Sequence, residues 1–99
     1  MLKQARLYIK GDVIGVGFRA WIKIQSKVFG ISGWVKNVFN KPEIYGVGGG
    51  IEALLQGEDD KIDKIIQEIK KGPSVSRVEN VEILWEEPKE ILEGFEIRK

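Results

Sequence analysis

Hydrophobic and polar positions alternate along several stretches of the chain. Ala5, Leu7 and Ile9 stand two residues apart, which predicts a strand with one buried face that ends near Gly11. The same reasoning predicts further strands over residues 31–38, 51–56 and 81–85, and a short terminal strand that holds Phe95 and Ile97.

Two other segments have the spacing of amphipathic helices. The first runs from about Arg19 to Phe29 and is closed by Gly30, a residue type favoured at helix ends. The second carries isoleucine at positions 62, 65, 66 and 69 and stops at Gly72 and Pro73. Between residues 39 and 50, one proline and several glycines predict an irregular stretch.

The order of these elements is β-α-β-β-α-β with one more strand at the end. This order predicts an α+β, ferredoxin-like split β-α-β sandwich: an antiparallel sheet with two helices on one face and a short extra C-terminal strand. At 99 residues, the chain has the length of a single domain, residues 1–99.

Composition narrows the chemistry. Cysteine and histidine are absent, which excludes thiolate nucleophiles, histidine-dependent triads and the usual zinc ligands, so we expect no metal and no cofactor.

The net charge is +1 with both signs interspersed, which argues against nucleic acid as a partner. No uncharged stretch approaches the ~18 residues of a membrane span, and the N-terminal residues lack the apolar core of a signal peptide. We therefore expect a cytoplasmic protein without a membrane partner.

The loop between the first strand and the first helix is the candidate site. It reads Gly15, Val16, Gly17, Phe18 and Arg19. Free N–H groups at a helix start attract anions, and a bound anion would also offset the cost of an arginine at that end of the helix dipole. A phosphate held by Arg19 and the loop amides is one interpretation; glycine turns beside a solvated arginine are the other. The same residues match G-x-G-x-x-A, but a dinucleotide site needs an acidic residue where Asn37 stands.

Two longer sequence segments resemble the motifs of a known protein family. The run from Tyr8 through Gly11 and Gly15 to Arg19, followed by Gly33-Trp34-Val35-Lys36-Asn37, resembles the two signatures of the acylphosphatase family, and the similarity covers nearly the whole chain. The resemblance implies a metal-independent hydrolase of acyl phosphates, a small-molecule substrate class. It also implies that Arg19 and the loop amides bind the phosphoryl group, while Asn37 orients the attacking water.

The function has alternatives. A non-catalytic module on the same fold could keep the anion site for a phosphorylated ligand or a partner protein. In the enzyme, the water proton could go to the substrate's own phosphate oxygen, or to a carboxylate such as Asp12 or Glu43.

Two departures accompany the resemblance. Ile14 stands where the family usually has glutamine, and roughly eight residues are inserted after Asn37, as a longer loop, a lid or a contact surface. We expect a monomer. Self-association through the 40–49 loop or through an apolar stripe on the first helix is the alternative; the stripe consists of Trp21, Ile24 and Val28.

Overall fold

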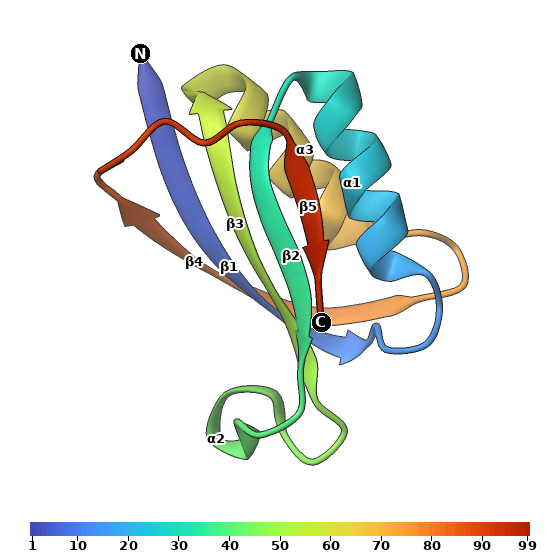
Figure 1. The fold of residues 1–99 in the computed structure, drawn as a ribbon. Helices are drawn as coiled ribbons and strands as arrows, with labels where there is room; N and C mark the ends of the chain where they lie inside the picture. The colour runs from blue at the N-terminus through green and yellow to red at the C-terminus, as the bar shows by residue number, and fades with distance from the viewer.

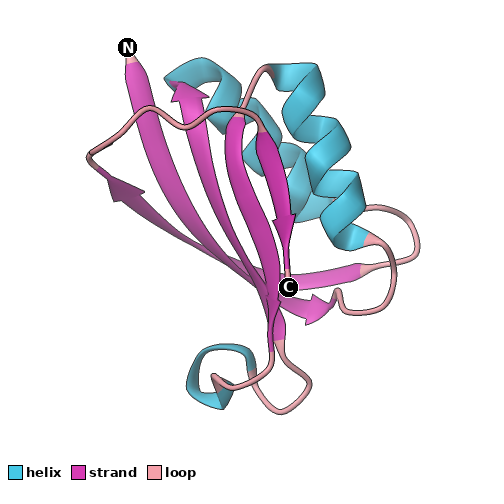
Figure 2. Cartoon of the chain, viewed as in Figure 1, coloured by secondary structure: helices cyan, strands magenta, loops and turns pink.

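The computed structural model describes residues 1–99 as five strands and three helices (Figures 1 and 2). The strands are β1 (Leu2–Asp12), β2 (Ser32–Val38), β3 (Gly50–Glu58), β4 (Arg77–Glu86) and β5 (Phe95–Arg98). The helices are α1 (Phe18–Phe29), α2 (Pro42–Tyr45) and α3 (Asp59–Lys71). The long elements follow the predicted order, and β1, β3 and β4 extend beyond the predicted strands at both ends.

The strands form one sheet in the order β4-β1-β3-β2-β5. The helices α1 and α3 lie on one face of this sheet (Figure 1), which confirms the ferredoxin-like arrangement. The four longer strands pair antiparallel, as predicted. The short extra strand β5, whose direction the sequence did not indicate, pairs with β2 in parallel. After β4 the chain crosses the sheet to the opposite edge (Figure 1) and enters β5 in the same direction as β2.

The core lies between the sheet and these two helices. Alternate residues of β1 face it, and the isoleucines of α3 pack against them in a cluster of 15 buried side chains. Burial of this apolar surface is the main term that stabilises the domain.

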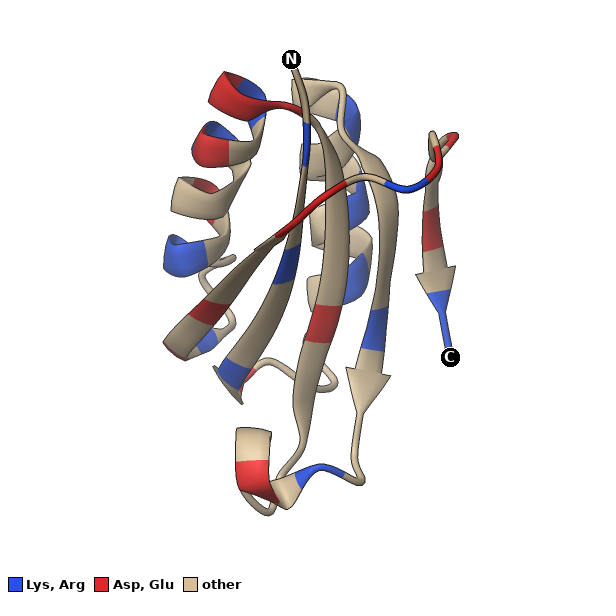
Figure 3. Ribbon diagram, turned by 90° about the vertical axis from the view of Figure 1, so that its left-hand side faces the viewer, with Lys and Arg blue, Asp and Glu red and all other residues tan.

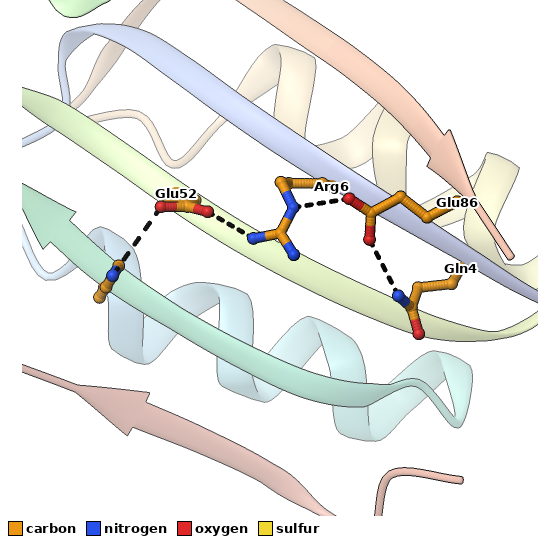
Figure 4. Close-up of polar contacts among 5 residues, drawn as sticks. Gln4, Arg6, Glu52 and Glu86 are labelled. Carbon is orange, nitrogen blue, oxygen red and sulfur yellow. Dashed lines mark hydrogen bonds and ion pairs between the residues drawn. The ribbon is translucent and has the colours of Figure 1, made fainter. Parts of the chain in front are cut away.

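A network of charged and amide side chains covers the other, open face of the sheet (Figure 4). Arg6 donates to Glu86 at 2.8 Å and also pairs with Glu52, and Gln4 donates to Glu86 at 2.9 Å. The Arg6 and Gln4 hydrogen bonds, in that order, lower the pKa of Glu86. This network gives the open face a polar surface.

Gln56 fixes the segment that crosses the open face. Its side chain is 2% exposed; it donates to the Glu90 carbonyl at 2.8 Å and accepts from the Leu92 N–H at 2.8 Å. These bonds hold the crossing segment against the middle of the sheet and so determine where β5 joins it.

The inserted segment folds as a single helical turn, α2, rather than as the irregular stretch that we predicted. Pro42 at the helix start and Glu43 in its first turn favour this turn. Its anchor is Tyr45, which is 4% exposed and packs edge-on against Tyr8 with ring centroids 6.3 Å apart. Gly50 makes room for the Tyr45 ring, because a Cβ there would lie 2.1 Å from Cδ1 of Tyr45.

The three residues of the apolar stripe predicted on α1 differ in their burial. Trp21 is half-buried, with its ring 5.4 Å from that of Phe18, whereas Ile24 and Val28 are 60% and 70% exposed. None of the helices is both long and apolar enough to span a membrane.

Candidate active site

The loop before α1 presents unpaired backbone donors. Gly15 and Gly17 have φ angles of 78° and 75°, a left-handed conformation that glycine adopts without strain. Gly17 caps α1 without a side-chain hydrogen bond, and the first helical bond runs from the Trp21 N–H to the Gly17 carbonyl at 3.0 Å. The preceding N–H groups of the first turn therefore have no helical partner and are available to an anion.

Arg19 is the second residue of α1 and is half-buried. Its Nη1 donates to the main-chain carbonyl of Arg98 in β5 at 3.0 Å. A guanidinium has five N–H donors, so this contact orients the side chain and leaves donors for a ligand.

Asn37 lies near the end of β2, opposite Ile51 in the register with β3. Alternation along β2 puts it on the same face as the buried Val35, which is the face that α1 covers. None of the side-chain hydrogen bonds in the protein involves Asn37. Its amide can therefore donate to and accept from a water molecule.

These groups meet at one cavity of about 170 Å³. Its lining consists of Val13, Gly15, Gly17, Phe18, Arg19, Ala20, Asn37 and Ile97. Of the predicted site residues, only Val16 is outside the lining, because its side chain packs against the core. No carboxylate side chain lines this cavity, so Asp12 and Glu43 do not face it.

Larger hollows exist elsewhere, including one of about 390 Å³ between Met1 and Trp85. That hollow lacks a glycine loop and has four acidic side chains in its lining, which is unsuitable for a phosphate. We assign the smaller cavity as the site because the unpaired donors, the arginine and the free amide converge there.

Sequence reasoning missed the contribution of β5. Ile97 lines the cavity and the Arg98 carbonyl binds Arg19. The alternation of Phe95 and Ile97 indicated a strand, but no local signal shows that this strand joins the sheet beside β2.

The insertion lies away from the cavity. No residue from 40 to 49 lines it; instead Asn40, Lys41, Ile44 and Tyr45 border a separate hollow on the open face, together with Tyr8 and Glu52. In this structure the insertion does not cover the site as a lid would.

Comparison with known proteins agrees with this geometry. The acylphosphatase family model matches residues 5–97. An acylphosphatase of Pyrobaculum islandicum is 42% identical over 94 residues, 95% of this chain and 92% of that protein. An acylphosphatase of Thermococcus kodakarensis is 38% identical over 94 residues, 95% of this chain and 93% of that protein. The crystal structure of the Bacillus subtilis acylphosphatase superposes with a TM-score of 0.86 at 27% identity and covers 100% of both chains. The chain belongs to the acylphosphatase family.

Proposed function

We propose that this protein is an acylphosphatase that hydrolyses the carboxyl–phosphate bond of acyl phosphates, giving a carboxylate and inorganic phosphate. The observation that carries this proposal is the meeting of Arg19, the unpaired loop donors and the free amide of Asn37 at one cavity without a carboxylate. Family membership supports the same activity.

Arg19 and the loop bind the phosphoryl group. The guanidinium donates to equatorial oxygens, and the N–H groups from Gly15 to Arg19 donate to the others. Because the Arg98 carbonyl accepts a hydrogen bond from the guanidinium, Arg19 is oriented before substrate binds. Donors fixed in advance stabilise developing charge without a reorganisation cost.

Asn37 orients the attacking water. Its amide oxygen accepts a hydrogen bond from the water, which directs a lone pair of the water towards phosphorus in line with the leaving carboxylate. The carboxylate is a good leaving group, so its departure needs no strong acid. Since no protein carboxylate lines the cavity, the water proton passes to a phosphate oxygen of the substrate.

The test is steady-state hydrolysis of benzoyl phosphate in excess chelator, with native protein, Arg19→Ala and Asn37→Ala. Asn40→Ala is the matched control, because Asn40 is exposed and lies outside the cavity. We expect native and control to turn over equally and both site variants to lose activity by about 100-fold or more. Phosphate binding by the native protein without turnover would instead favour the non-catalytic module. A monomeric state and a cytoplasmic location stay predictions from the sequence.

A further inference from the structure

The first helix carries an uncompensated stripe of positive charge. Arg19, Lys23 and Lys27 follow one another at intervals of four residues, and α1 contains no acidic residue. Figure 3 shows blue bands and no red on this helix, whereas α3 carries both colours. None of the three cations takes part in an ion pair. With a rise of 1.5 Å per residue, the stripe is about 12 Å long.

The stripe faces β5. Arg19 binds the Arg98 carbonyl, and Lys23 and Lys27 border a hollow of about 450 Å³ whose lining includes Ser32 and Phe95. The cavity at Arg19 and this second hollow therefore follow one another along the seam between α1 and β5, which run side by side in Figure 1. The two share no lining residue, and together we call them the trough. Neither hollow is lined by an acidic side chain.

The floor of this trough is apolar. Phe95 and Ile97 alternate along β5 and so share one face; Phe95 lines the outer hollow and Ile97 the phosphate cavity. Ile97 is 40% exposed, so a ligand can contact its side chain. The trough combines a phosphate site at one end, an apolar floor and a cationic wall.

We propose that this trough is a subsite for the acyl group, and that Lys23 and Lys27 bind a second anionic group at the far end of that acyl group. The inference rests on the proposed function and deepens it, since it names the preferred substrates as acyl phosphates that carry a further carboxylate or phosphate. Lys23 stands about 6 Å from Arg19 along the helix and Lys27 about 12 Å. In an acyl phosphate with one aromatic ring, the distance from the phosphoryl group to a group at the far end of the ring falls between these two distances. The ammonium groups and the Ser32 hydroxyl supply the donors.

The expected selectivity is modest, because both lysines are exposed. Exposed ion pairs contribute little individually, and two of them correspond to about a fivefold gain in kcat/KM. Salt screens such pairs, so the gain should disappear at about 1 M ionic strength.

The test compares benzoyl phosphate with 4-carboxybenzoyl phosphate, two substrates that differ only in the distal carboxylate. We expect native protein to prefer the carboxylated substrate by about fivefold in kcat/KM at low salt. The double variant Lys23→Gln, Lys27→Gln should lose this preference and hydrolyse benzoyl phosphate about as fast as native protein does. Lys64→Gln, an exposed lysine of α3, is the control and should keep the preference.

The outcomes separate the two proposals. Equal kcat/KM for both substrates in native protein, or a preference that the double variant retains, would overturn the subsite while leaving the hydrolase intact. Failure of native protein to hydrolyse either substrate would refute the proposed function and the subsite with it.

Discussion

The hydroxyl of Tyr45 offers a sensitive test of how the inserted segment packs. The residue is 4% exposed, and its hydroxyl oxygen is buried without a hydrogen-bond partner. Burial, and then the nearby Glu52 carboxylate, raise the pKa of Tyr45 above its ordinary value. The substitution Tyr45→Phe keeps the ring against Tyr8 and Gly50 and removes only this hydroxyl.

At neutral pH the variant should be more stable than the native protein. A buried polar group without a partner costs about 1–3 kcal/mol, and its removal leaves a small void that takes back part of the gain. We therefore expect the free energy of unfolding to rise by about 1 kcal/mol.

At high pH the difference should grow. The unfolded chain ionises Tyr45 at a pKa of about 10, whereas the raised pKa keeps the folded tyrosine protonated. Above pH 10 the folded state thus binds more protons than the unfolded state, and native stability falls by about 1.4 kcal/mol per pH unit from this group alone. Phenylalanine does not ionise, so the variant loses no stability in this way. The difference in the free energy of unfolding between the variant and native protein should therefore be about 1.4 kcal/mol larger at pH 11 than at pH 7.

The assay is urea unfolding at pH 7, 10 and 11 of native protein, Tyr45→Phe and the control Tyr8→Phe. All other titrating groups are present in the native protein and in the variants, so their effects on the free energy of unfolding cancel when the proteins are compared at the same pH. Tyr8 is only half-buried, so its variant should differ little from native protein at pH 7. A Tyr45→Phe variant that is less stable at pH 7, with a gap that stays constant up to pH 11, would refute the packing of α2 on the open face.

Three further predictions concern the polar network, the sheet and the site. Glu86→Gln should cost about 1 kcal/mol at pH 7, since its pair with Arg6 is partly exposed. The pKa of Glu86 is lowered in the folded state. Its contribution to stability is therefore present above the ordinary glutamate pKa of about 4.3 and is lost as pH falls through the folded pKa; a cost unchanged at pH 3 would contradict this. Gly33→Ala should destabilise by about 3 kcal/mol or more in thermal unfolding, because its Cβ would meet the Leu54 carbonyl oxygen at 1.8 Å at a φ of 146°. Gly48→Ala has open space and should be nearly neutral, and equal effects of the two substitutions would disprove the argument. Inorganic phosphate at 100 times its Kd should stabilise the native protein by about 2.7 kcal/mol, and an unchanged Tm would argue against the anion site.

Local patterns were enough to predict most of the fold. The alternation in β1 and the isoleucine spacing in α3 identify their elements and their buried faces, because burial selects side chains by strand and helix period. The sequence predicted an irregular stretch in place of α2, because the glycines at 46 and 48–50 outweighed the helix-start signals of Pro42 and Glu43. What holds that turn is the burial of Tyr45 against Tyr8, a contact between distant segments that no local pattern encodes.

The site, too, has features that the local sequence predicts and features that depend on contacts between distant segments. The loop glycines and Arg19 could be identified by their position between a strand and a helix, since the free N–H groups of a helix start are a local property. The place of Asn37 came from the family resemblance, and the contribution of β5 was not predicted. A parallel strand of four residues at the sheet edge depends on how the chain crosses the open face, and the Arg98 contact uses a main-chain carbonyl that any residue could supply.

The most direct test of the account separates phosphate binding from turnover. The Kd of inorganic phosphate, measured by titration calorimetry, and kcat for benzoyl phosphate are compared for native protein, Arg19→Ala and Asn37→Ala. Arg19→Ala should weaken phosphate binding by about tenfold or more, since a hydrogen bond to a charged group contributes about 1.5–3 kcal/mol. Asn37→Ala should bind phosphate nearly as tightly as native protein while kcat falls by about 100-fold or more. If Asn37→Ala keeps its kcat, or if its phosphate Kd rises as much as that of Arg19→Ala, then the proposed division between an arginine that binds phosphate and an asparagine that orients water is wrong.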